Sequence, residues 1–250
     1  GLTYDETLTI NITDADEAPT DIALSSTSVA ENAGSNAAVG TLSNTDADGS
    51  SWTYSLVAGS GDTDNGLFNI SGTSLRATSS LDYEGASSRS VRIRVTDNTS
   101  LTYDESFTIS VTNVNEAPTD IAAAGTMSIS ESASVGASVT NGTLSETDVD
   151  AGDTHTYSER TGGDGEDYFA VSSSGTITLQ AAVDYETAQS YTYEVRVTDA
   201  GGLTYDETLT INITDVNETP SAPNLSLSGS SLCAGTTLTA TGSASADPEG

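Results

Sequence analysis

The chain has 250 residues, and its 37 acidic residues against six Arg and no Lys give a formal net charge of −31. Nucleic acids and anionic membranes are poor partners for such a chain, because they carry the same sign of charge. The length is enough for two domains of roughly 100 residues and a remainder. No run of about 18 apolar residues that could span a membrane is present.

Alternating apolar and polar residues predict β-strands along most of the chain. The first is expected at Leu8, Ile10 and Ile12. Val91, Ile93 and Val95 alternate in the same way. For the first hundred-residue stretch we expect strands at about 20–24, 38–42, 52–57, 67–70, 74–77, 90–96 and 102–112. About seven strands with frequent turn signals, and no amphipathic helix pattern, predict a Greek-key immunoglobulin-like β-sandwich.

The sequence also predicts the positions of Trp52 and His155. Trp52, in the third predicted strand, is expected to fill the sandwich core. His155, the only histidine, is expected at the surface or at a strand end. It has no evident nucleophile, so the chain is not predicted to be an enzyme and no catalytic or cofactor-binding residues are proposed.

The chain contains a repeat of about one hundred residues. Leu-Thr-Tyr-Asp-Glu begins at residues 2, 101 and 203, which gives offsets of 99 and 102. The flanking motifs keep the same order: Thr-Asp-Ala-Asp at 45–48 returns as Thr-Asp-Val-Asp at 147–150, and Leu-Asp-Tyr-Glu at 81–84 returns as Val-Asp-Tyr-Glu at 183–186. We therefore predict tandem domains with boundaries near Pro19, Pro118 and Pro220.

Successive strands of a sandwich run in alternate directions, so each connection between them lies at one of its two ends. The order of the strands therefore predicts the end at which each acidic motif lies. Glu31, Asp82, Glu84, Asn113, Asn115 and Glu116 are expected at the end where the first full repeat stops, and Asp148, Asp150 and Asp199 at the end where the second begins. Seven carboxylates near one short link would repel one another strongly without a counter-ion. Oxygen-only, carboxylate-rich ligand sets favour Ca²⁺ over Mg²⁺.

Five acidic motifs follow one another along the chain: Ala-Glu-Asn at 30–32, Leu-Asp-Tyr-Glu at 81–84, Asn-Val-Asn-Glu-Ala-Pro at 113–118, Asp-Val-Asp at 148–150 and Asp199. In these motifs the chain resembles tandem cadherin repeats of the bacterial cadherin-like type over residues 1–220. It departs from the family pattern at Asn113, Glu116, Tyr83 and Ser130-Glu131-Ser132. The resemblance implies cadherin-like β-sandwiches with about three Ca²⁺ per link.

The resemblance also implies three sets of metal ligands. The middle link would use Glu31, Asp82, Glu84, Asn115, Glu116, Asp148, Asp150 and Asp199. The first link would use Asp16, Glu17, Asp46, Asp48 and Asp97, and the third Glu131, Asp184, Glu186, Asn217 and Glu218, with Asp247 and Glu249 as candidates for its far side.

The predicted domains follow from these boundaries. Residues 1–17 are expected to be the last strand of a preceding repeat, 18–117 and 118–219 two cadherin-like repeats, and 220–250 the start of a further immunoglobulin-like or polycystic-kidney-disease-type β domain. An RTX-like nonapeptide motif, matched over the eight residues 162–169, occurs once and is expected to be an ordinary loop.

The predicted function is a calcium-dependent extracellular adhesion or stalk segment, secreted or attached to the cell surface, whose links are stiffened by Ca²⁺. Its expected partners are calcium ions and a protein or glycan on another cell or surface, including a second copy of itself. Two alternatives remain open: a structural subunit of a cell-surface filament or layer, and a carbohydrate-binding module.

Overall fold

The computed structural model describes residues 1–49 and 51–218 in full, and the backbone of 225–228 and 239–242. It divides into two compact units, unit 1 (Gly1–Val114) and unit 2 (Asn115–Gly250). The predicted last module lies mostly outside the described residues, which include a β-hairpin of β17 (Leu225–Ser228) and β18 (Thr239–Gly242). Cys233, Asp247 and Glu249 also lie outside them.

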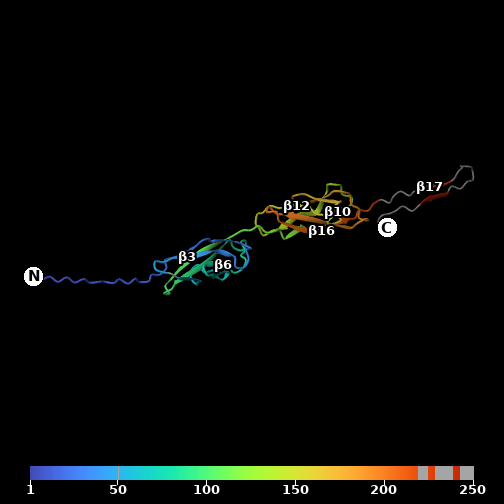
Figure 1. Cartoon of the computed structure of the whole chain (residues 1–250). Coiled ribbons are helices and arrows are strands. Elements are labelled where there is room, and N and C mark those ends of the chain that lie inside the picture. The colour runs from blue at the N-terminus through green and yellow to red at the C-terminus, as the bar shows by residue number, and fades with distance from the viewer. Residues whose placement is uncertain (50, 219–224, 229–238, 243–250) are drawn as a thin grey trace, which may run out of the picture. The chain divides into compact units, whose positions relative to one another are not determined.

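Unit 1 is a sandwich of two four-stranded sheets (Figure 1). One sheet has the order β1-β3-β6-β5 and the other β2-β8-β7-β4. The strand bounds are β1 Asp21–Leu24, β2 Ser28–Ala30, β3 Ala38–Thr45, β4 Trp52–Leu56, β5 Phe68–Ser71, β6 Ser74–Ala77, β7 Ser88–Asp97 and β8 Thr102–Thr112. The single turn of 3-10 helix η1, Asn65–Leu67, is the only helix in the described parts of the chain.

Unit 2 repeats this strand order. Its strands are β9 Asp120–Ala123, β10 Met127–Ser130, β11 Ser138–Thr147, β12 Thr156–Glu159, β13 Phe169–Val171, β14 Thr176–Leu179, β15 Ser190–Thr198 and β16 Thr204–Thr214. The sheets β9-β11-β14-β13 and β10-β16-β15-β12 are joined by one pairing of Ser128 with Thr140. The predicted all-β sandwich class is confirmed.

The alternating pattern of β7 and β15 correctly predicted the core. Val91, Ile93 and Val95 are fully buried in unit 1, as are Val195 and Val197 in unit 2. Their polar neighbours face the opposite side of the sheet, since successive side chains of a strand alternate between its faces. Burial of these branched side chains, each contributing roughly 1.5–3 kcal/mol, fixes the register of the long β7–β8 and β15–β16 hairpins.

Two local predictions were wrong, and one strand of each repeat was missed. The predicted strand at 20–24 is β1, but the unpredicted strand after it, β2 in unit 1 and β10 in unit 2, lies in the other sheet and pairs in parallel with β8 or β16. Residues 1–20 contain no strand, and Leu8, Ile10 and Ile12 are 83–94% exposed, because no described segment pairs with them. Trp52 is 38% exposed rather than buried, since it is the first residue of β4 and lies at the edge of the core.

No helix among the described residues is long and apolar enough to cross a membrane.

Candidate metal sites

The predicted ligands fall into two kinds of set, which are defined by their sequence motifs and occur in both units. The Asp-x-Glu set contains Glu31, Asp82 and Glu84 in unit 1, and Glu131, Asp184 and Glu186 in unit 2. The Asp-x-Asp set contains Asp16, Glu17, Asp46, Asp48 and Asp97 in unit 1, and Asn115, Glu116, Asp148, Asp150 and Asp199 in unit 2.

The Asp-x-Glu set of unit 1 is built around Glu31, which follows β2 and is 2% exposed. Its Oε2 accepts a hydrogen bond of 2.8 Å from the N–H of Tyr83, and its Oε1 accepts one of 2.8 Å from the N–H of Val114. These two bonds join the loop after Leu81 to the end of β8. Asp82 and Glu84 bring one oxygen each to within 4.8 Å of a Glu31 oxygen and of one another.

Unit 2 contains the same arrangement. Glu131 accepts hydrogen bonds from the N–H groups of Tyr185 (2.8 Å) and Val216 (2.6 Å). Oxygens of Glu131, Asp184 and Glu186 again lie within 4.8 Å of one another. These three residues line a pocket of about 320 Å³ together with Ser132, Val183 and Glu218. Asn217 is exposed in the segment after β16.

The electrostatics of this second set favour a cation. A bond to its own backbone lowers the pKa of Glu186, but burial, the hydrogen bond with Asp184 and repulsion from Glu131 and Asp184 raise it above its ordinary value. A bond from the Thr187 hydroxyl lowers the pKa of Asp184. Neighbouring carboxylates that repel one another in this way are stabilised by a divalent ion.

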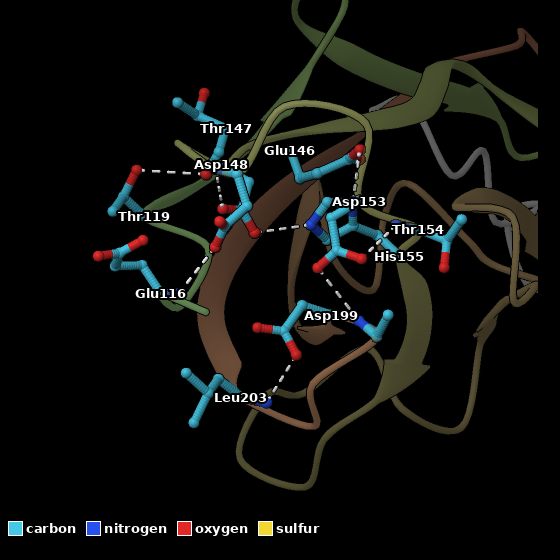
Figure 2. A network of polar contacts seen from close by, with 12 residues as sticks. Glu116, Thr119, Glu146, Thr147, Asp148, Asp153, Thr154, His155, Asp199 and Leu203 are labelled. Atoms are coloured by element: carbon cyan, nitrogen blue, oxygen red, sulfur yellow. Dashed lines mark hydrogen bonds and ion pairs between the residues drawn. The ribbon is translucent and has the colours of Figure 1, made fainter. Parts of the chain in front are cut away.

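The Asp-x-Asp set of unit 2 lies where the linker meets the loops after β11 and β15 (Figure 2). The N–H of Glu116 donates to Oδ2 of Asp150 at 2.8 Å, and the N–H of Asp150 donates to Oδ1 of Asp148 at 3.0 Å. Asp199, 5% exposed, accepts bonds from the Leu203 N–H at 2.7 Å and from the Asn115 side-chain amide at 2.8 Å. Although burial alone would raise the pKa of Asp199, these bonds hold it below its usual range.

Unit 1 repeats this geometry with one substitution. The N–H of Glu17 donates to Oδ2 of Asp48 at 3.0 Å, and the N–H of Asp48 donates to Oδ1 of Asp46 at 3.2 Å. Asp97 is 7% exposed and its Oδ1 accepts the Leu101 N–H at 2.9 Å. Asp16 stands where unit 2 has Asn115 and cannot donate as an amide does.

A buried carboxylate oxygen in unit 1 is consequently left without a donor. Oδ2 of Asp97 has no hydrogen-bond partner, whereas Oδ2 of Asp199 accepts the amide of Asn115. A buried acceptor without a donor is costly, and a cation is a ligand that suits such a carboxylate oxygen. The residues present therefore fit a bound Ca²⁺.

His155 directly precedes β12, so the predicted strand-end position is confirmed, whereas the alternative of a surface position is not. Its side chain is 7% exposed, and its ring nitrogens lie 2.8 Å from Oδ2 of Asp148 and 3.2 Å from Oε1 of Glu146 (Figure 2). Burial lowers its pKa, but the bond to Asp148 and the charges of Glu146, Asp148 and Asp153 outweigh burial and raise it. The missed signal is positional, since His155 and Trp52 both precede a strand tyrosine by two residues.

The RTX-like nonapeptide forms a loop between β12 and β13. Oδ1 of Asp164 accepts hydrogen bonds from the N–H and the hydroxyl of Thr192, at 2.5 and 2.8 Å. Asp164 thus anchors the loop to β15.

Comparisons with known proteins agree with this fold. Residues 125–214 match the family model described as the Cadherin domain. The crystal structure of human protocadherin-24 EC1-2 is 22% identical with a TM-score of 0.64, and the match covers 81% of this chain and 100% of that one. Mouse cadherin-23 EC22-24 is 21% identical with a TM-score of 0.59, covering 77% of this chain and 64% of that one.

A third match has the same character. The protocadherin GammaB4 extracellular domain is 23% identical with a TM-score of 0.56, and the match covers 84% of this chain and 35% of that one. At these identities the structural matches show the fold, which is that of cadherin domains.

Proposed function

We propose that the chain is a segment of an extracellular adhesion or stalk protein in which Ca²⁺ stiffens the links between cadherin-like sandwiches. The observation that carries this proposal is the recurrence of one carboxylate geometry in both units. A glutamate, Glu31 or Glu131, is fixed by two backbone N–H groups beside an Asp-x-Glu pair. Repetition of an acidic cluster in every unit suits a structural ion better than a catalytic centre.

The arginines of the chain do not neutralise these sets. Four of the six pair with aspartates on β8 and β16: Arg92 and Arg94 with Asp104, and Arg160 and Arg196 with Asp206. Of the other two, Arg89 donates to the main-chain oxygen of Asp82, and Arg76 donates to Ser74. An external cation is therefore suited to balance the negative charge that the arginines, and His155 beside Asp148, leave on these sets.

Connectivity supports an ion at the middle link. Val114 donates to Glu31 of unit 1, and Glu116 donates to Asp150 of unit 2. Two residues of extended chain span at most about 7 Å, so the backbone anchors of the two sets are close along the chain. We propose that Glu31, Asp82, Glu84, Asn115, Glu116, Asp148, Asp150 and Asp199 hold Ca²⁺ there.

The bound ion would supply positive charge and flexible oxygen coordination, which suits a set of Asp, Glu and Asn side chains. The chain's own residues do the rest. Backbone N–H groups orient Glu31 and Asp150, and both carboxylates repel their acidic neighbours when no cation is present. The link is then expected to flex while each sandwich keeps its core.

The first and third sets extend the proposal. Asp16, Glu17, Asp46, Asp48 and Asp97 would bind Ca²⁺ before unit 1, and Glu131, Asp184, Glu186, Asn217 and Glu218 after unit 2. Protein partners, including a second copy of the chain, are proposed for adhesion. No feature of the described residues favours a glycan partner, and none favours a filament rather than a stalk.

Small-angle scattering of the full chain in Ca²⁺ and in EDTA tests the link. We expect a narrower distribution of interdomain distances in Ca²⁺, with an unchanged far-ultraviolet circular dichroism spectrum. Asp150→Asn should lose much of the difference, and Asp5→Asn, in the exposed segment before β1, is the matched control. Identical scattering of the wild type in both conditions would refute the proposal.

A further inference from the structure

A ring N–H donates to the first aspartate of the Asp-x-Asp motif in both units. In unit 1, Nε1 of Trp52 lies 2.9 Å from Oδ2 of Asp46. In unit 2, Nε2 of His155 lies 2.8 Å from Oδ2 of Asp148. The indole and the imidazole differ in size and chemistry, so what they share here is the donor and its target.

The two rings occupy the same place in the fold. Trp52 precedes Tyr54 by two residues, and Tyr54 pairs with Val95. His155 precedes Tyr157 by two residues, and Tyr157 pairs with Val197. Val95 and Val197 are themselves equivalent positions of β7 and β15, 102 residues apart like the repeat itself.

The second oxygen of each aspartate is also fixed. Oδ1 of Asp46 accepts the N–H of Asp48 at 3.2 Å, and Oδ1 of Asp148 accepts the N–H of Asp150 at 3.0 Å. Each carboxylate is thus held from two sides, by its own loop and by a ring at or just before the start of the next strand. The bond from Trp52 is the largest cause of the lowered pKa of Asp46.

We propose that Trp52 and His155 are positioning residues that orient Asp46 and Asp148 for the cation. This inference rests on the proposed function, because it assigns the rings a role in Ca²⁺ binding. Each carboxylate oxygen has two lone-pair directions, so one can accept the ring N–H while another faces an ion. Groups that orient metal ligands commonly account for 10–100-fold in metal affinity.

Trp52 and His155 differ in burial, which argues against packing as the role that they share. Trp52 is 38% exposed and its ring fills no core, whereas the His155 side chain is 7% exposed. If packing alone had selected these residues, they would have no common hydrogen-bond target. Removing the N–H while keeping an aromatic ring is therefore the informative change.

Calcium titration by calorimetry on the full chain tests the proposal. Trp52→Phe and His155→Phe remove the donor, and each should weaken Ca²⁺ binding at its own Asp-x-Asp set by about 10–100-fold. Trp52→His and His155→Gln keep a nitrogen donor and should stay within about threefold of the wild type. Glu6→Gln, an exposed change outside every set, is the control.

A second readout does not depend on calcium. The chain contains one tryptophan, so its indole N–H gives a single resonance in a nitrogen–proton spectrum. In EDTA this resonance should be slow to exchange with solvent, and Asp46→Asn should shift it and speed its exchange. This measurement examines the hydrogen bond itself.

The outcomes are distinguishable. Absence of Ca²⁺ binding by the wild type, with a protected indole resonance, overturns the proposed function and leaves the hydrogen bond as a structural feature. Wild-type affinity in both Phe variants overturns the positioning role alone. Because Trp52 is partly exposed, Trp52→Phe remains decisive even where His155→Phe fails to fold.

Discussion

Replacement of Glu31 by Gln changes the one buried acidic side chain on which the Asp-x-Glu set of unit 1 is built. The amide keeps the size of the carboxylate, but only one of its two polar atoms can accept a hydrogen bond. Glu31 accepts the N–H groups of Tyr83 and Val114 through different oxygens. In Glu31→Gln, one of these backbone donors therefore faces an amide N–H group.

The magnitude follows from two separate effects. Leaving one buried backbone donor unsatisfied costs about 1–3 kcal/mol, with or without calcium. At a Ca²⁺ concentration about 100-fold above the dissociation constant, ligand binding stabilises the wild type by a further ~2.7 kcal/mol, and the variant loses most of this. Since 1 kcal/mol shifts the melting temperature of a 60–100-residue domain by about 4–8 °C, both effects are measurable.

Thermal unfolding of the full chain in EDTA and in Ca²⁺ separates the two effects. Glu31→Gln should lower the transition of unit 1 in EDTA and should also reduce the gain on adding Ca²⁺. Glu6→Gln should do neither, and Glu131→Gln should act on unit 2 instead. If Glu31→Gln kept the full gain from Ca²⁺, Glu31 would be a structural carboxylate and its assignment as a ligand would be wrong.

Three further outcomes are expected. Arg94 holds the pKa of Asp104 below its ordinary value, so this pair stabilises unit 1 above about pH 4, and the stabilisation is lost as acid protonates Asp104. In Asp104→Asn, the free energy of unfolding measured in urea should therefore fall less steeply with decreasing pH. An unchanged pH dependence would contradict this. Asp164→Ala should cost unit 2 about 1–3 kcal/mol through the lost bonds to Thr192, with the number of Ca²⁺ bound by calorimetry unchanged; a lost Ca²⁺ would instead make Asp164 a ligand. Glutamate-specific proteolysis after Glu116 should run several-fold faster in EDTA than in Ca²⁺, and equal rates on gels would argue against a calcium-stiffened link.

The parts of the fold that were predicted correctly depend on local patterns. Alternation along β7 and β15 identifies the core face, because each strand buries one side only. The acidic motifs recur with the repeat. The alternating direction of successive strands predicts that Asp82 and Glu84 lie at the same end of unit 1 as Glu31, and the structure brings one oxygen of each within 4.8 Å of the others. Both arguments need only strand order, which the repeat and the turn residues supplied.

The features that sequence reasoning missed depend on partners distant in the chain. The crossing of β2 to the second sheet is decided by its parallel pairing with β8, some 80 residues later. Ile10 is exposed because no strand of the described residues pairs with its segment, although its own alternation is as regular as that of Ile109. An alternating pattern shows which face of a strand is apolar, but only tertiary contacts show whether the strand joins a sheet that buries this face.

The exposure of Trp52 and the hydrogen-bond target of His155 could not be predicted from the sequence. A lone tryptophan in an apolar strand is normally assigned to the core, and a lone histidine to the surface, yet here the tryptophan is the more exposed of the two. Their shared role is visible only after the repeats are aligned, because the indole donates to Asp46 and the imidazole to the equivalent Asp148. Divergent residues with a common hydrogen-bond target indicate that the aspartate's orientation, rather than either ring, is what this position of the fold requires.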